Sequence, residues 1–144
     1  VFGEPRGITL IDDFAHHPTA VRATIEATRL RFGEKRKLWV VFEPRTNTTR
    51  RNIFQDRYGR AFDASDALLV APVHRMEAIP EDERFSPEQL VSDACAGGVD
   101  ARNCSSVQAI VDVLSEEARP GDVVLLLSNG GFGGIYDTLP VALA

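Results

Sequence analysis

Two aspartates and two histidines lie within six residues near the start of the chain, in the stretch Asp12-Asp13-Phe14-Ala15-His16-His17. Carboxylates and imidazoles are side chains that often bind charged ligands or move protons. The stretch follows the apolar run 7–11 and precedes Pro18, which is typical of a first helical turn. A strand, a polar turn and a helix predict a βα junction, where open parallel sheets bind ligands. The alternative is structural: an Asp or Thr caps the helix and the histidines are solvated.

Four loops are predicted to open on the same edge of the sheet: 12–18, 43–49, 72–85 and 128–134. The polar residues that they carry are Asp12, Asp13, His16, His17, Arg45, Asn47, His74, Arg75 and Asn129. This set is rich in groups that bind anions, and the fork of an arginine matches a carboxylate with two hydrogen bonds. We therefore expect a substrate that carries carboxylates. The arginines of segment 45–60 favour a small anion, although a solvated helix face explains them equally well.

A glycine-rich run, Asn129-Gly130-Gly131-Phe132-Gly133-Gly134, follows the most hydrophobic segment of the chain. It does not complete a dinucleotide-binding fingerprint, because Tyr136 stands where the third glycine is required. We expect its backbone amides to contact an anion at the start of the last helix. The alternative is that these glycines only allow a sharp turn against a neighbouring loop.

Several kinds of catalytic site are not indicated. The chain contains no G-x-x-x-x-G-K-[ST] loop with which to hold a triphosphate. No metal site is expected, because consecutive residues such as those of 12–17 point in different directions and rarely complete a coordination shell. No serine or cysteine nucleophile with a base at a recognisable spacing is present.

Apolar runs and helix signals alternate along the chain. Strands are expected at 7–12, 37–43, 66–71 and 123–127 with a short edge strand at 99–102, and helices at 18–32, at 50–63, from 86, from 105, and at 134–143. Near-continuous apolar strands indicate a sheet that is covered on both faces. We therefore predict one α/β domain over residues 1–144, with a mostly parallel twisted sheet and helices on both faces.

The chain is acidic, with a net charge of -5 and a pI near 5.2. Nucleic acids and anionic membranes require a basic face, so neither is an expected partner. Cys95 and Cys104 lack the spacing of a redox or zinc site, and the chain has neither a signal peptide nor an apolar run that would span a bilayer. We expect a cytoplasmic protein, and the abrupt start without Met suggests a piece of a longer one.

The stretch 12–19, Asp-Asp-Phe-Ala-His-His-Pro-Thr after a strand, resembles the motif that opens the C-terminal domain of Mur ligases, ATP-dependent enzymes that form amide bonds in peptidoglycan synthesis. Stretches 42–48 and 128–135 are similar to the branch of this family that joins UDP-N-acetylmuramate to L-alanyl-γ-D-glutamyl-meso-diaminopimelate in cell-wall recycling. The resemblance covers the whole chain in order. It implies the third, Rossmann-like domain of an enzyme whose N-terminal domain binds the UDP-sugar and whose central domain carries the P-loop.

This resemblance implies a role for each loop. His16 would lie near the incoming amine as the catalytic residue. The residues expected to face the nucleotide are Asp12, Asp13 and His17. The residues expected to contact the peptide substrate are Phe14, Arg45, Asn47, His74, Arg75, Asn129, Gly130, Gly131 and Phe132. ATP and Mg²⁺ would be bound mainly by the central domain, so this domain would position the amine and exclude water, and would be inactive alone.

Segment 45–49 departs from the alanine-adding members of the family, which typically have His-Arg-Tyr-Ser/Thr-Arg after the second strand. Phe14 stands where those members commonly have Tyr. Both differences favour an acceptor other than L-alanine, although an L-alanine ligase stays open as the alternative. Two further hypotheses also stay open: a non-catalytic module that binds a peptide or nucleotide, and an independent α/β hydrolase or transferase.

Overall fold

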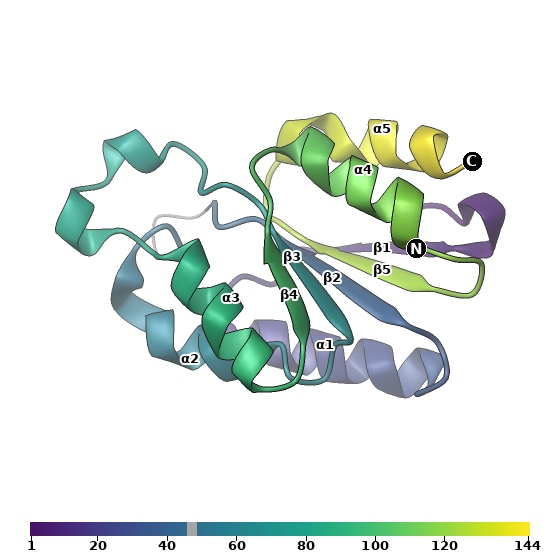
Figure 1. Cartoon of the computed structure of the whole chain (residues 1–144), viewed down its shortest axis with the longest axis horizontal. Helices are drawn as coiled ribbons and strands as arrows, with labels where there is room; N and C mark the ends of the chain where they lie inside the picture. The colour runs from purple at the N-terminus through teal and green to yellow at the C-terminus, as the bar shows by residue number, and fades with distance from the viewer. Residues whose placement is uncertain (46–48) are drawn as a thin grey trace.

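The computed structural model describes residues 1–45 and 49–144. Its five strands form one sheet in the order β1-β5-β2-β3-β4, and every neighbouring pair is parallel (Figure 1). The strands are β1 Thr9–Asp13, β2 Leu38–Phe42, β3 Ala67–Val70, β4 Asp100–Asn103 and β5 Val123–Leu127. The predicted α/β class is therefore confirmed, with a sheet that is parallel throughout.

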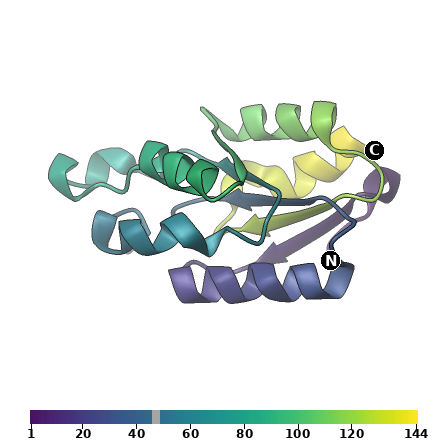
Figure 2. The same cartoon turned by 60° about the horizontal axis from the view of Figure 1, so that its bottom comes forward.

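Helices cover both faces of the sheet (Figures 1 and 2). They are α1 Pro18–Phe32, α2 Gln55–Ala61, α3 Pro87–Ala96, α4 Val107–Glu117 and α5 Ile135–Leu143. The first three pack on one face and the last two on the other, which divides the core into two clusters. Every residue of β2 and β5 is buried, as their unbroken apolar sequences predict. No helix in the described ranges is long and apolar enough to cross a membrane.

The bounds of α1 agree with the sequence signals at both of its ends. Pro18 occupies the first turn, where a missing backbone N–H costs nothing. Gly33 ends the helix with a φ of +83°, and its N–H donates to the Arg29 carbonyl oxygen at 2.8 Å. The first turn of this helix therefore begins five residues after the end of β1, as the proposed junction requires.

The segment predicted as one helix over 50–63 is instead a short 3₁₀ turn, Asn52–Phe54, followed by α2. Gln55 and Ser86 exchange two hydrogen bonds, Gln55 Nε2 to the Ser86 carbonyl oxygen at 3.0 Å and the Ser86 N–H to Gln55 Oε1 at 2.8 Å. Contacts with this distant segment therefore set where the regular helix begins. The loop over 72–85 also contains two 3₁₀ turns, Met76–Ala78 and Glu81–Glu83.

All five strands end at one level of the sheet. The register pairs Asp13 with Leu127, Leu127 with Phe42, Phe42 with Val70, and Val70 with Asn103. The loops that leave these positions consequently start side by side along one edge. Asp12 and Asp13 are the last two residues of β1, and the other predicted site residues come after the ends of β1, β2, β3 and β5 in the sequence.

Candidate functional site

The loop after β1 is held in shape by two of its own polar side chains. Asp13 Oδ1 accepts a hydrogen bond from the Ala15 N–H at 2.8 Å. His17 caps α1: its Nδ1 accepts from the Thr19 N–H at 3.3 Å, and its ring packs edge to face on Phe54 with the centroids 4.7 Å apart. The N-cap is therefore His17, and not the Asp or Thr that the sequence offered.

Three other predicted residues are exposed: Asp12, near the end of β1, and Phe14 and His16, in the loop that follows. His16 Nδ1 lies 3.1 Å from the Phe14 carbonyl oxygen, and the Phe14 side chain is left largely in solvent. The hydroxyl of Tyr58, in α2, donates a hydrogen bond to the His16 carbonyl oxygen. Burial raises the pKa of Tyr58, so the hydroxyl keeps its proton at neutral pH. The backbone of His16 is thus fixed while its imidazole stays accessible.

A buried hydrogen-bond chain joins the loops after β1, β5 and β2. Ser128 Oγ donates to Glu43 Oε1 at 2.7 Å, and both residues are buried. The Gly130 N–H donates to Ser128 Oγ at 3.2 Å, and the Ser128 N–H donates to the Asp13 carbonyl oxygen at 3.3 Å. Neither Glu43 nor Ser128 was singled out from the sequence. Their only signal is a polar residue directly after an apolar strand, and their pairing depends on β5 lying next to β2.

The Arg45 side chain contacts this hydrogen-bond network through Glu43. Its Nη1 is 3.7 Å from Glu43 Oε1 and 3.4 Å from His74 Nδ1. A Cβ atom placed on Gly130 would lie 2.0 Å from Arg45 Nε, so the guanidinium stem occupies the space that the glycine leaves open. The Arg45 side chain remains 31% exposed. A cation is thereby held at the sheet edge on a side chain that remains partly exposed.

The start of the loop after β3 is anchored through its backbone. The His74 N–H donates to the Pro44 carbonyl oxygen at 3.1 Å. Arg50 Nη1 donates to the carbonyl oxygens of His74 and Arg75 at 3.3 and 3.4 Å, and Arg50 Nε is buried without a partner in the described ranges. Arg75 has a φ of +50° and a ψ of 49°, a left-handed conformation that costs a non-glycine residue energy. The hydrogen bonds from Arg50 hold this backbone conformation, and the exposed Arg75 side chain leaves the loop from it.

The glycine-rich run has a packing role at one predicted substrate residue. Phe132 is fully buried in the core cluster that α4 and α5 cover, so its side chain packs under the loop and does not face a substrate as expected. Its φ of +47° turns the ring inward, and Gly133 and Gly134 follow with φ of +58° and +79°. A Cβ at Gly133 would approach Val107 Cγ2 to 3.0 Å, which supports the sharp-turn alternative there. Asn129 and Gly131, by contrast, are exposed.

Tyr136, in the first turn of α5, is half-buried near the same edge of the sheet. Burial raises its pKa most, and the nearby negative charges of Asp12 and Glu43 raise it further. Its ring also packs edge to face on Phe2 at 5.5 Å. The phenol is therefore protonated at neutral pH and lies within electrostatic reach of two carboxylates at the sheet edge. In the sequence it stands out only as a departure from the glycine fingerprint.

Two other basic residues of segment 45–60 make their contacts away from Arg45. Arg51 pairs with Glu83 at 3.2 Å, and Arg57 donates to Thr19 Oγ1 at 3.0 Å. The predicted residue Asn47 lies outside the described residues. No group of three or more His, Cys, Asp or Glu side chains placed to hold a metal ion occurs within 1–45 and 49–144.

A family model described as "Mur ligase, glutamate ligase domain" matches residues 1–130. The chain belongs to the Mur ligase family. It is 37% identical over 143 residues to the UDP-N-acetylmuramate:L-alanyl-γ-D-glutamyl-meso-2,6-diaminoheptandioate ligase of Escherichia coli K12, covering 99% of this chain and 29% of that protein. It is 39% identical over 132 residues to the UDP-N-acetylmuramate:L-alanine ligase of Sorangium cellulosum, covering 90% of this chain and 28% of that protein.

The fold agrees with a solved structure from the same family. The murein peptide ligase of Psychrobacter arcticus superimposes with a TM-score of 0.82 at 31% identity, covering 98% of this chain and 28% of that one. The chain therefore spans less than a third of the length of the Mur ligases that it matches. Family membership and fold, as expected from the sequence motifs, are confirmed, while relatives with different acceptors match at similar identity.

Proposed function

We propose that this chain is the C-terminal domain of an ATP-dependent Mur ligase that joins UDP-N-acetylmuramate to L-alanyl-γ-D-glutamyl-meso-diaminopimelate in peptidoglycan recycling. The observation that supports this acceptor best is the anchored Arg45, which presents an accessible guanidinium at the sheet edge beside His74. The tripeptide carries several carboxylates along its length. A fixed arginine at the edge suits the recognition of one of them.

In this proposal the chain orients the acceptor. Arg45, Arg75 and the exposed 129–131 turn bind the peptide, and His16 lies where the amine arrives and can take up its proton. Asp12, Asp13 and His17 face the nucleotide from the side of this domain. Because Asp13 and His17 already hold the loop, their contribution to that face is its shape, and the exposed Asp12 carboxylate supplies the accessible charge.

ATP and Mg²⁺ would activate the muramate carboxylate. This chain lacks the features of their main binding site. The chain has no Walker loop. The backbone N–H groups of Gly130 and Gly134 already donate internal hydrogen bonds, so they are not available to a phosphate. We therefore assign ATP and Mg²⁺ to a central P-loop domain outside these 144 residues, with the UDP-sugar on an N-terminal domain. Closure of this domain against the other two would exclude water from the activated carboxylate. Such an enzyme would act in the cytoplasm, without a nucleic-acid or membrane partner.

A ligase specific for L-alanine is the second candidate, because the Sorangium relative with that name is 39% identical over 132 residues. The deciding experiment offers both acceptors at once to the intact ligase that contains this domain, with UDP-N-acetylmuramate, ATP and Mg²⁺, and identifies the products by mass spectrometry. The proposal predicts the tripeptide adduct as the main product. Predominant formation of the L-alanine adduct would assign the enzyme to the other branch, and no adduct with either acceptor would contradict the ligase function itself.

A further inference from the structure

The sheet has a second place where its connections diverge, away from the site around Arg45. The loop after β3 leads to α3 on one face, whereas the loop after β4 leads to α4 on the other face (Figure 1). Val70 and Asn103, the last residues of these two strands, are partners in the register. In open α/β sheets, ligands bind where neighbouring loops part in this way.

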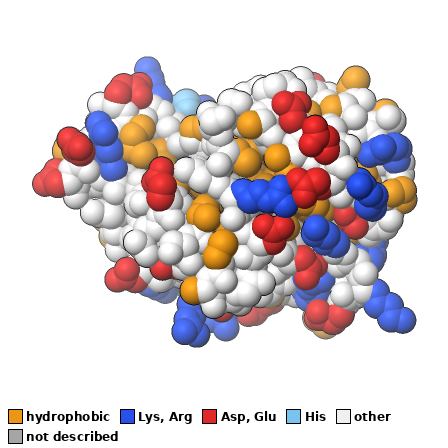
Figure 3. Space-filling view, viewed as in Figure 1, with side chains coloured by type: hydrophobic (Ala, Val, Ile, Leu, Met, Phe, Trp, Pro, Cys, Tyr) orange, Lys and Arg blue, Asp and Glu red, His pale blue; other side chains and the backbone are white. Residues whose placement is uncertain are grey.

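A cavity of about 510 Å³ lies at this point, which we call the β3–β4 cleft. Its lining residues are Pro72, Val73, Met76, Glu81, Arg84, Phe85, Ser86, Pro87, Glu88, Asn103, Cys104 and Ser105. The floor is apolar, because Val73 and Phe85 are buried in the core and Met76 packs against it. Its size lies within the usual range of about 300–1,000 Å³ for small-molecule sites. In the space-filling view, apolar side chains reach the surface on the left of this face between acidic and basic ones (Figure 3).

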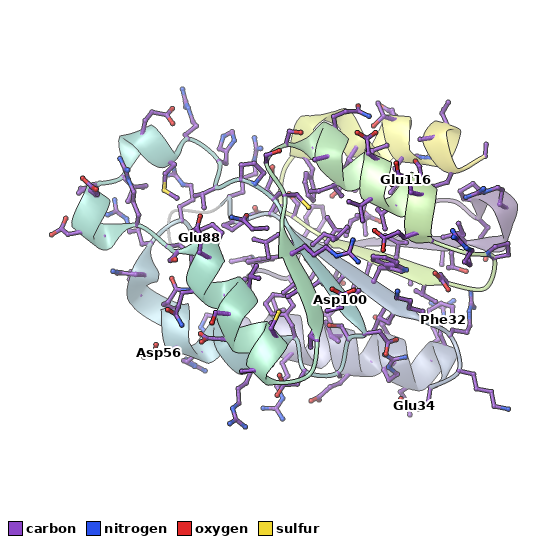
Figure 4. All side chains as sticks on the ribbon, viewed as in Figure 1. Phe32, Glu34, Asp56, Glu88, Asp100 and Glu116 are labelled. Atoms are coloured by element: carbon purple, nitrogen blue, oxygen red, sulfur yellow. The ribbon has the colours of Figure 1, made fainter. Side chains whose placement is uncertain are left out.

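Three charged side chains line the cleft, and none has an ionic partner in the described part of the chain. Arg84 donates its Nε–H to the Ile79 carbonyl oxygen at 2.9 Å, and no carboxylate pairs with its guanidinium. Glu88 accepts only from neutral donors, Asn103 Nδ2 at 3.2 Å and Ser86 Oγ at 3.4 Å. Glu88 lies at the end of α3 that faces the cleft (Figure 4). Charges of both signs thus share one cavity without neutralising each other.

The backbone contributes partial positive charge to one side of this cavity. Ser86 caps α3 and Ser106 caps α4, so two helix N-termini meet at the cleft. Helix N-termini carry partial positive charge and favour a carboxylate near Arg84. The carboxylates of Glu81 and Glu88 favour an ammonium group, and the apolar floor favours a hydrocarbon side chain.

We propose that the β3–β4 cleft is a second ligand site, which binds a free amino acid or a short peptide with an apolar side chain. The ligand's carboxylate pairs with Arg84, its ammonium group pairs with Glu81 and Glu88, and its side chain covers Val73 and Phe85. The site is separate from the one around Arg45, and the inference does not depend on which acceptor the ligase uses.

The test is an NMR titration of the ¹⁵N-labelled 144-residue chain with L-leucine and with the dipeptide L-alanyl-L-leucine. Saturable shifts are expected at backbone amides of the cleft, among them Val73, Phe85 and Ser105. N-acetyl-L-leucine lacks the ammonium group and L-leucinamide lacks the carboxylate, so each should bind at least about tenfold more weakly. The tighter of the two main probes distinguishes a free amino acid from a peptide as the natural ligand.

Matched variants locate the ligand. Arg84→Gln and Glu88→Gln should each weaken binding at least about tenfold, because each removes one charged partner. Glu77→Gln is the control: Glu77 is exposed on the same loop and does not line the cleft. No saturable shift with either main probe up to tens of millimolar, equal binding of the two blocked analogues, or shifts confined to the loops around Arg45 would each overturn the proposal.

Discussion

Replacing Gly130 by alanine should remove Arg45 from the candidate site without unfolding the domain. The new Cβ would lie 2.0 Å from Arg45 Nε, 2.3 Å from its Cδ and 2.6 Å from its Cζ. Contacts that short are not tolerated, so the arginine must turn away. It would lose its positions 3.7 Å from Glu43 Oε1 and 3.4 Å from His74 Nδ1.

The energetic consequences fall on binding more than on folding. The Arg45 side chain is 31% exposed and can move into solvent, so the free energy of unfolding should fall by about 1 kcal/mol or less. A charged hydrogen bond between Arg45 and a peptide carboxylate contributes about 2 kcal/mol. Its loss should raise the KM for the tripeptide about 30-fold in the intact ligase, with little change in the KM for ATP.

Gly131→Ala is the matched control in this assay. It introduces the same methyl group one residue later, where nothing lies within 4 Å of the new Cβ and φ is -71°. Its thermal stability should remain close to that of the wild type, and its KM for the tripeptide should rise far less than that of Gly130→Ala, because Arg45 keeps its place. If Gly131→Ala raises the KM for the tripeptide as much as Gly130→Ala does, or if Gly130→Ala weakens tripeptide and ATP equally, the assigned role of Arg45 is refuted.

Three further variants test other parts of the account. Glu43→Gln should lower the pKa of Tyr136, which the Glu43 charge raises, and should raise the KM for the tripeptide; an unchanged phenol titration, followed by ultraviolet absorbance, would contradict the placement. Phe132→Ala should cost about 3–5 kcal/mol in denaturant unfolding, since the ring is fully buried, and a loss under about 1 kcal/mol would place the ring outside the core. The Arg102 hydrogen bond lowers the native pKa of Glu117 below its ordinary 4.5, so that stabilisation is complete above 4.5 and is lost as the pH falls through the lowered value. Arg102→Gln should therefore flatten the loss of thermal stability on acidification, and an unchanged acid profile would argue against the pair.

The architecture was largely predictable because its signals are local. Continuous apolar runs mark strands that are buried on both faces, and Pro18 and Gly33 mark the two ends of α1. The helix expected over 50–63 is shorter in the structure, because the Gln55–Ser86 hydrogen bonds reach 31 residues along the chain. No local pattern carries that information.

The candidate site was predictable as a set of loops but not as a set of contacts. Asp12 and His16 are exposed at the expected edge, whereas Asp13 and His17 also hold the loop together. The binding-site interpretation therefore suits Asp12 and His16, and the structural interpretation suits Asp13 and His17. Asp13 and His17 have a structural role because the turn leaves the N–H groups of Ala15 and Thr19 without backbone partners, and these two side chains accept from them.

The contacts between loops depend on strand order. Glu43 and Ser128 are 85 residues apart, and their hydrogen bond exists because β5 inserts between β1 and β2. Phe132 was assigned to the substrate because the family resemblance implies that the loop over 128–132 lines the peptide pocket. Its positive φ reverses the direction of the ring, and the sequence carries no signal for that.

We infer that the peptide acceptor is recognised within this chain, at the edge formed by β1, β5 and β2. Calorimetric titration of the 144-residue chain with L-alanyl-γ-D-glutamyl-meso-diaminopimelate, repeated with L-alanine and with Arg45→Ala, tests it directly. We predict saturable binding of the tripeptide that Arg45→Ala abolishes, and weaker binding of L-alanine that Arg45→Ala leaves unchanged. Binding of L-alanine in preference to the tripeptide, or undiminished tripeptide binding by Arg45→Ala, would contradict it.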